Sequence, residues 1–156
     1  MTNRQWDLLK GLEPDEMAEV LLLGISRQLP EASVLFEIGA EADHLFLVAS
    51  GRVDLTLPID LDGKREDVLV EERVPGQDLG WSALIPPHRF TLKAIAPMET
   101  EIIALPRDEL LRHFSGRPEV GYAVMRNLAG TVGQRLQTLQ VMWLRELQRL
   151  AEKQSA

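Results

Sequence analysis

The chain has 156 residues, of which 45% are apolar and 26% are charged, and its formal net charge at neutral pH is −7. This length suits one compact domain with an appendage, and the apolar content is high enough for a core, which argues against disorder. The absence of cysteine excludes thiol catalysis, disulfides, cysteine-ligated zinc and iron–sulfur clusters.

The charge is unevenly distributed along the chain. Residues 1–116 hold 11 basic and 21 acidic residues, a net charge of −10, whereas residues 117–156 hold 6 basic and 3 acidic residues, a net charge of +3. An acidic body disfavours broad nucleic-acid binding, so we expect no direct nucleic-acid partner. No apolar run reaches the length of a membrane span, and the N-terminus lacks the apolar core of a signal peptide, so the expected location is the cytoplasm.

Helices are predicted for the N-terminal region, residues 1–30. Residues 3–10 carry apolar side chains at helical spacing and form a short amphipathic helix that ends at Gly11. A second helix is expected to begin at Pro14, because proline suits the first helical turn and acidic residues surround it. Its apolar face extends as far as Ile25.

Short strand-like runs separated by turn residues follow over residues 31–106. One run, residues 44–49, is continuously apolar, as in a buried strand. Another alternates from Val53 to Leu57 and is expected to stop at Pro58, before a hairpin loop that contains Asp62-Gly63. Many short strands at this spacing predict a closed or double-sheet β fold, in a mainly β protein with flanking helices.

Two helices are predicted after the β region, a short one over residues 107–116 and a long one over residues 117–156. The long helix is roughly 55 Å long at 1.5 Å per residue, which is too long for its apolar seam to be buried by a domain of this size. A parallel helix from a second copy covers it most simply, which predicts a homodimer. The alternative is a helix folded back on its own barrel. The seam consists of Leu128, Val132, Leu136, Leu139, Trp143, Leu147 and Leu150.

The stretch of residues 79–91 stands out among the predicted loops. It combines a glycine, two prolines and a His-Arg pair between two strand-like runs. Exposed backbone N–H groups beside a fixed cation are typical of an anion-binding loop.

The arrangement of these elements resembles the cyclic-nucleotide-binding domain family. The resemblance rests on Gly39, residues 42–48, Gly51-Arg52-Val53, the stretch from Gly80 to Thr91, and residues 102–107 with the long helix. It implies a double-stranded β-roll of the jelly-roll type, and a loop that acts as a phosphate-binding cassette within residues 79–91. In that family a cassette glutamate holds the ribose hydroxyl, an arginine pairs with the cyclic phosphate, and backbone N–H groups complete the site.

The cassette residues partly follow the family pattern. Trp81 stands at the place of the glutamate, His88 stands at the place of the arginine with Arg89 one position later, and Phe90 replaces a small residue. An indole donates a single hydrogen bond and cannot accept one from a ribose hydroxyl. The ligand-binding residues that the resemblance implies are Gly80, Trp81, Ser82, Ala83, His88, Arg89, Phe90 and Thr91.

The long helix also has an implied role. In cAMP-responsive activators of the family it faces the base, and the matching residues are Thr138, Leu139 and Gln140, with Leu139 at the place of a threonine. Those activators carry a helix-turn-helix domain after the helix. No such domain is expected in this chain.

Two functional hypotheses follow. The first is a stand-alone regulatory module that senses a small anion, cAMP, cGMP or a related ligand, and signals through its dimer helix to an effector protein. The second is a degenerate dimeric protein-interaction module, in which Trp81 and Phe90 fill the pocket. An enzyme on a similar roll, such as a metal-binding cupin, needs clustered histidines, whereas His44, His88 and His113 stand alone in the sequence. We therefore expect no enzymatic activity and no metal site.

Overall fold

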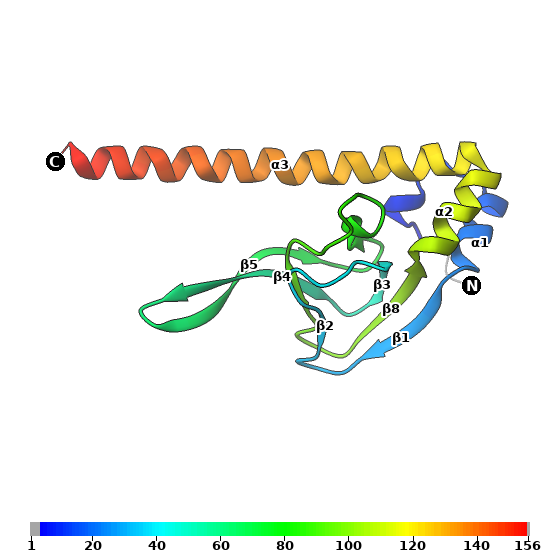
Figure 1. Cartoon of the computed structure of the whole chain (residues 1–156), viewed down its shortest axis with the longest axis horizontal. Coiled ribbons are helices and arrows are strands. Elements are labelled where there is room, and N and C mark those ends of the chain that lie inside the picture. The colour runs from blue at the N-terminus through cyan, green and yellow to red at the C-terminus, as the bar shows by residue number, and fades with distance from the viewer. Residues whose placement is uncertain (1–3, 156) are drawn as a thin grey trace.

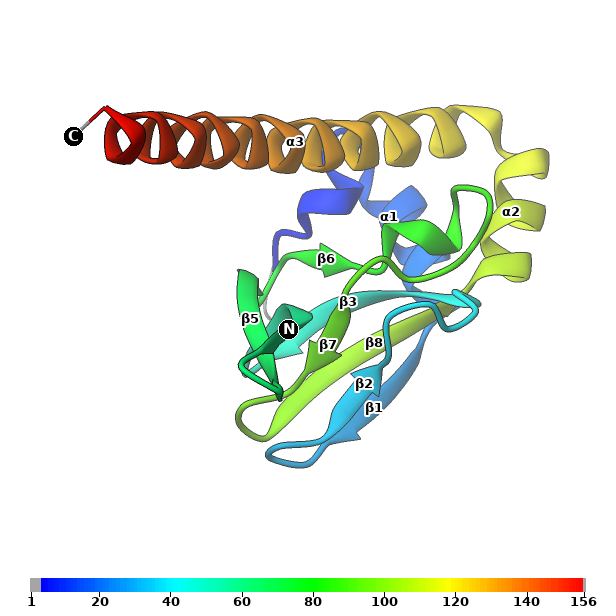
Figure 2. The same cartoon turned by 60° about the vertical axis from the view of Figure 1, so that its left-hand side comes forward.

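Two four-stranded antiparallel sheets form the body of the protein in the computed structural model, which describes residues 4–155. The first sheet has the order β1 (Ile25–Leu29), β8 (Thr100–Pro106), β3 (His44–Ser50) and β6 (Asp78–Leu79). The second has the order β2 (Val34–Phe36), β7 (Lys93–Ile95), β4 (Val53–Leu61) and β5 (Lys64–Arg73). Figure 2 shows the two sheets beneath one long helix. The predicted β-roll with flanking helices is confirmed.

The core centres on β3 and β8. These strands pair in register, with Leu45 opposite Leu105 and Val48 opposite Ile102, and all four side chains are fully buried. Because β3 lies between β8 and β6 and is covered on both faces, five consecutive residues from Leu45 to Ala49 are buried. The apolar run at 44–49 was therefore correctly predicted as a buried strand.

Three helices flank the sheets: α1 (Pro14–Leu21), α2 (Arg107–Gly116) and α3 (Pro118–Gln154). As predicted, α1 begins at Pro14; the backbone N–H of Glu13 donates to Glu16 Oε1 at 2.9 Å, which completes a capping box. Helices α1 and α2 lie beneath the N-terminal end of α3 (Figure 1). Both helices predicted after the β region are present.

The prediction of a helix over residues 3–10 was wrong for the described residues 4–10. Of these residues, only Asp7–Leu9 are helical, and they form the 3-10 turn η1, while Trp6 is extended. The backbone N–H of Asp7 donates to the Gly76 carbonyl at 2.9 Å, which draws this segment onto the turn after β5. Tertiary contacts therefore override the local helical pattern here. Residue 3 lies outside the described residues.

The prediction that Ile25 belongs to the helix face was also wrong. Helix α1 ends at Leu21, and Ile25 begins β1, opposite Ala104 of β8. Gly24 allows the chain to approach the sheet, because a Cβ there would collide with the Ile103 side chain. The N-terminal region of residues 1–30 therefore contains an edge strand besides its helix.

Strand β4 does not stop at Pro58, contrary to expectation, but continues to Leu61. Beyond Thr56 its only neighbour is β5, so Pro58 lies where one side of the strand has no partner and its missing N–H is tolerated. The hairpin turn at Asp62-Gly63 is as predicted, with φ of +51° and +76° at the two residues.

Helix α3 has 37 residues and two different halves. In the first half, Val120, Val124 and Leu128 are buried against the body. The Asn127 amide nitrogen donates to the carbonyls of Leu8 and Lys10 at 2.8 and 2.9 Å, which ties this half to the N-terminal segment. The second half continues as an exposed rod above the β4–β5 hairpin (Figure 1). Within residues 4–155, no helix combines the length and apolarity needed to cross a membrane.

Candidate functional site

The candidate site is the loop between β6 and β7, which contains the predicted cassette residues. Gly80 ends β6 with φ of +86° and leads into η2 (Trp81–Ala83), a 3-10 turn. A Cβ at Gly80 would lie 3.3 Å from His44 O, from Phe46 Cδ2 and from Phe90 Cε1. Glycine is therefore required here both by the backbone conformation and by the close contacts.

Backbone N–H groups of this loop are already used within the protein. The N–H of Ala83 donates to Gly80 O and that of Leu84 to Trp81 O, both at 3.0 Å. The N–H of His88 donates to Ile85 O, and that of Phe90 to Ala40 O, also at 3.0 Å. These four donors are engaged by the loop and its neighbour, so they do not point freely at a ligand.

Arg89 faces outward rather than into the loop. Its side chain is exposed, its Nη1 donates to the Gly39 carbonyl at 3.1 Å, and its backbone bridges to Glu41. His88 adopts φ of +59° and its Nδ1 lies 3.2 Å from the Ser82 carbonyl. The two candidate cations for a phosphate are therefore turned toward backbone carbonyls of the protein itself.

Phe90 fills the interior of the loop. It is 5% exposed, and its ring is stacked on Phe36 with centroids 3.6 Å apart and planes 8° apart. The space that remains inside, next to Gly80, Trp81, Ser82 and Thr91, has a volume of only about 10 Å³. Sites for small ligands usually measure about 300–1,000 Å³. The space of that size beside the cassette is a cavity of about 370 Å³ between Trp81, Thr91 and α3, so a ligand would lie there rather than between Gly80 and Phe90.

Arg135 on α3 is a residue of the site that the sequence analysis missed. It borders the closed interior of the loop, a larger apolar cavity and a separate polar cavity. Its side chain is 14% exposed, and its Nε donates to Glu71 Oε2 at 2.7 Å. The sequence could have indicated Arg135 through its position, seven residues after Leu128 and three after Val132. This spacing places a cation on the apolar face of the helix.

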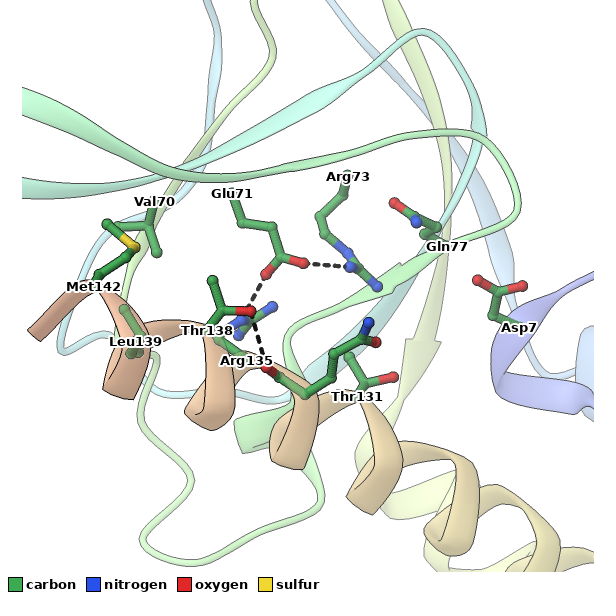
Figure 3. A pocket seen from close by; sticks show the side chains of 11 residues that line it. Asp7, Val70, Glu71, Arg73, Gln77, Thr131, Arg135, Thr138, Leu139 and Met142 are labelled. Carbon is green, nitrogen blue, oxygen red and sulfur yellow. Dashed lines mark hydrogen bonds and ion pairs between the residues drawn. The ribbon is translucent and has the colours of Figure 1, made fainter. Parts of the chain in front are cut away.

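A chain of ion pairs continues from Arg135 into the body. Figure 3 shows Glu71 of β5 between the two guanidinium groups, with its Oε1 accepting from Arg73 Nη1 at 2.8 Å. Arg73 is buried; its Nε donates to the Asp78 carbonyl oxygen at 2.7 Å, and its Nη2 lies 3.8 Å from Asp78 Oδ1. Burial raises the pKa of the Asp78 carboxyl above its usual 3.8, although the Arg73 charge opposes this shift.

The three helix residues predicted to face a base are not equally placed. Leu139 lines both the apolar and the polar cavity, and Thr138 lines only the polar one. Gln140 is exposed and lines neither of these cavities. The Thr138 hydroxyl donates to the Gln134 carbonyl at 3.1 Å, within its own helix.

The residues of the predicted dimer seam differ in burial, as the two halves of α3 do. Leu128 is 1% exposed because it packs into the core of its own chain, so the exposed part of the predicted seam begins after it. Val132 is half-buried. The other seam residues are exposed, at 43–63% of their surface: Leu136, Leu139, Trp143, Leu147 and Leu150.

Two apolar cavities lie side by side along the middle of α3. One, of about 370 Å³, is lined by Trp81, Leu136 and Leu139 among others. The next, also of about 370 Å³, is lined by Trp81, Ile85 and Val132 among others. Trp81 and Val132 border both, so the two form one groove between the loop and the helix. Trp81 thus faces the helix groove as well as the closed interior.

The described residues offer no metal site. Within residues 4–155, no group of three or more His, Asp or Glu side chains is close enough to hold an ion. His44 and His113 each have an acidic neighbour instead: His44 Nδ1 lies 2.8 Å from Asp43 Oδ1, and His113 Nε2 lies 3.5 Å from Glu19 Oε2.

The comparisons with known proteins agree with this fold. The family model described as the cyclic nucleotide-binding domain matches residues 26–116. The cyclic AMP receptor protein of Thermus thermophilus is 30% identical over 129 residues, which cover 83% of this chain and 56% of that protein. Glutaminase 1 of Bradyrhizobium diazoefficiens is 32% identical over 129 residues, but these make up only 20% of its length. The chain thus spans between a fifth and just over half of these relatives.

Solved structures give the same result. The catabolite activator protein of Thermus thermophilus superimposes with a TM-score of 0.73 at 28% identity, over 88% of this chain and 61% of that one. A cyclic nucleotide-binding domain from Methylobacillus flagellatus gives a TM-score of 0.77 over 90% of this chain and 80% of that one. At 19% identity, this second likeness concerns the fold alone. The family model covers more than half of the chain, and the chain therefore belongs to the cyclic nucleotide-binding domain family.

Proposed function

We propose that the protein is a regulatory module that works as a homodimer through α3 and does not hold a cyclic nucleotide in its cassette. One observation carries the second part: His88 and Arg89, the two candidate cations of the cassette, contact backbone carbonyls of the protein itself. In addition, the stacked rings of Phe36 and Phe90 leave only about 10 Å³ beside Gly80.

The second half of α3 supports the dimer. Seam residues from Leu136 to Leu150 leave large apolar side chains exposed, with Trp143 at 63%. Contiguous apolar surface of this kind marks an interaction site in soluble proteins. A second copy supplies an identical apolar helix, and the groove bordered by Trp81 and Val132 continues the seam toward the cassette. The fold-back alternative is supported for α3 as far as Arg135, whose Nε donates to Glu71 Oε2 at 2.7 Å.

Calorimetric titration with cAMP and with cGMP tests the closed cassette. We expect no heat of binding and no melting shift with either nucleotide at millimolar concentration. A ligand at 100 times its dissociation constant would stabilise the protein by about 2.7 kcal/mol, which is readily measured. Saturable binding of either nucleotide, weakened by Arg89→Ala, would contradict this part of the proposal.

Light scattering tests the dimer. The wild-type chain should have twice the monomer mass at micromolar concentration, and Trp143→Glu should convert it to a monomer, because it places a charge in the apolar seam. The matched control is Gln148→Glu, which adds the same charge to an exposed residue outside the seam and should leave the dimer intact. A monomeric wild-type protein would overturn the dimer.

A second candidate function is a sensor of cAMP or cGMP. The relative named cyclic AMP receptor protein supports it, as do Gly80 and Thr91, which match the family cassette. For this function the ligand would occupy the cavity of about 370 Å³ between Trp81, Thr91 and α3. The nucleotide titration described above separates the two candidates, since only the sensor gives a melting shift.

We further propose that the module acts on an effector protein in the cytoplasm, without direct contact to nucleic acid and without catalysis of its own. The glutaminase relatives support a regulatory partner, because the matching stretch forms only about a fifth of a much longer chain named for an enzyme. The acidic body, with a net charge of −10 over residues 1–116, disfavours a nucleic-acid partner.

A further inference from the structure

The apolar seam of α3 has an unusual period. Its residues follow one another at intervals of four, four and three positions, and this order occurs twice between Leu128 and Leu150. Leu139 follows Leu128 by one such repeat, and Leu150 follows Leu139 by the next. The seam therefore repeats every 11 residues, whereas an ordinary two-stranded coiled coil repeats every seven.

A seven-residue repeat fits the second half of the helix less well. After Trp143 it would turn Glu146 and Lys153 inward. It would also leave Leu147 outside the contact. Glu146 is exposed, and both of its carboxylate oxygens accept from Arg149, Oε2 from Nε at 3.1 Å and Oε1 from Nη2. Moving this ion pair into an apolar contact would cost the desolvation of its charges, so the seam passes through Leu147.

We propose that α3 pairs along this seam with α3 of a second copy, in parallel, as a straight or slightly right-handed helix pair rather than a left-handed coiled coil. The inference rests on the proposed homodimer and specifies the contacts that form it. An 11-residue repeat has about 3.67 residues per turn, slightly more than the 3.6 of a straight α-helix, whereas a heptad has 3.5. The handedness of the pair follows from the sign of this difference.

The period of the seam selects a second copy as the partner. Figure 1 shows α3 as a straight helix over its whole length. The inward-facing residues of a heptad helix drift by about 20° per seven residues relative to a straight helix, so such a helix would lose contact with the seam between Val132 and Leu150. A second copy of α3 has the same 11-residue repeat and keeps contact along all of this stretch.

The parallel orientation rests on what lies at the two ends of the exposed seam. At the body end, Val132 borders the apolar groove beside Trp81. At the other end, the last turn of α3 carries Glu152 and Lys153. A parallel pair places one apolar groove against the other. An antiparallel pair would place the charges of the last turn against the groove, where they would lose water without gaining a partner.

The residues on either side of the seam suit such a pair. One flank carries charges, but Glu146 and Arg149 already neutralise each other within the same helix. The other flank is uncharged and consists of Ala129, Gly133 and Gln140. In a parallel pair each flank of one helix faces the opposite flank of its partner, so the charges of one copy do not meet like charges of the second.

Single-cysteine variants test this geometry, because the chain has no cysteine of its own. In a parallel pair each seam residue faces its own counterpart, and a disulfide forms only where the two Cα atoms come within about 7 Å. Under oxidation by diamide, Leu147→Cys should therefore form the interchain disulfide at least about tenfold faster than Glu146→Cys. Both residues are exposed in the single chain, so neither substitution opens a cavity in its core. Non-reducing electrophoresis measures the two rates.

Gln148→Cys serves as the control, since it changes an exposed residue outside the seam and should form no disulfide. Faster cross-linking of Glu146→Cys than of Leu147→Cys would overturn the 11-residue seam in favour of a heptad. A mixture of Leu136→Cys and Leu147→Cys that yields only the mixed disulfide would overturn the parallel orientation.

Light scattering of the unoxidised samples separates this inference from the proposed function. A monomer that forms no disulfide at any of these positions would remove the proposed homodimer and the pairing with it. A dimer that cross-links through Glu146→Cys, or through none of these variants, would remove only the pairing along this seam and leave the homodimer standing.

Discussion

The cassette loop and the second half of α3 differ in how many of their side chains have a partner within the protein. In the loop, Arg89 and His88 contact backbone carbonyls and Phe90 is stacked in the core, so its groups are used internally. In the helix, the side chains from Leu136 to Leu150 are apolar and exposed. Unsatisfied surface is where a partner gains free energy by binding. This contrast supports the proposal that the protein interacts with a partner through the helix rather than through the loop.

The largest expected effect is on stability and comes from a substitution in the cassette loop. Phe90→Ala removes a buried ring from the Phe36 stack and should lower the free energy of unfolding by about 3–5 kcal/mol. It also opens the cassette interior, so the variant should gain a melting shift with cAMP that the wild type lacks. Chemical denaturation with and without nucleotide measures both.

The partner ring provides the control for that change. Phe36→Ala should cost a similar amount, and the double variant should cost less than the sum of the two, because each ring loses the same stacking partner. Strict additivity would show that the two rings do not stabilise the closed cassette together.

The next largest effect distinguishes the buried first half of α3 from its exposed second half. Leu128→Ala should destabilise the chain by about 2–5 kcal/mol at every protein concentration, because it leaves a cavity in the chain's own core. Leu136→Ala should cost about 0.5 kcal/mol or less in dilute solution, and more at higher concentration if α3 forms the dimer. Denaturant unfolding at two concentrations measures both variants. An equal cost for the two leucines in dilute solution would contradict the division of the helix.

The smallest effect concerns the ion pairs between the two regions. Burial raises the pKa of Asp78 in the folded protein above its usual 3.8, so the folded state retains a proton that the unfolded state releases. Stability should therefore fall as the pH rises from about 4 through the folded pKa, by about 1.4 kcal/mol for each pH unit that separates the folded pKa from the unfolded one. In Asp78→Asn this fall should be absent. Unfolding between pH 4 and pH 8 measures it, and identical pH profiles would exclude a raised pKa.

Much of the fold could be predicted from the sequence because local pattern and tertiary structure agree there. The apolar run at 44–49, the Asp62-Gly63 hairpin and the start of α1 at Pro14 each depend on neighbouring residues only. The strand conformation of Ile25 could not be predicted, because the residue continues a helical pattern in the sequence. In the structure it begins β1, which pairs with β8.

The cassette loop was predicted to lie between two strands, and it connects β6 and β7, but the direction of its side chains could not be predicted. The outward direction of Arg89 depends on its pairing with Glu41, far away in the sequence. One position along an extended chain reverses the face of a side chain. Arg135 was missed because its partner Glu71 lies on a strand that sequence alone could not place beside the helix.

The two hydrogen bonds that Asn127 donates to the N-terminal segment have a mechanical consequence. Together with the Arg135–Glu71 ion pair they fix α3 as far as Arg135, and the stretch from there to Gln154 extends about 28 Å at 1.5 Å per residue. A rigid helix held at one end amplifies motion, because a tilt of about 5° at the held end displaces the other end by about 2 Å over that length. Small rearrangements around residues 8–10 would thus become larger displacements at the C-terminal end of α3. In the proposed dimer, such displacements would change how the two α3 helices pack.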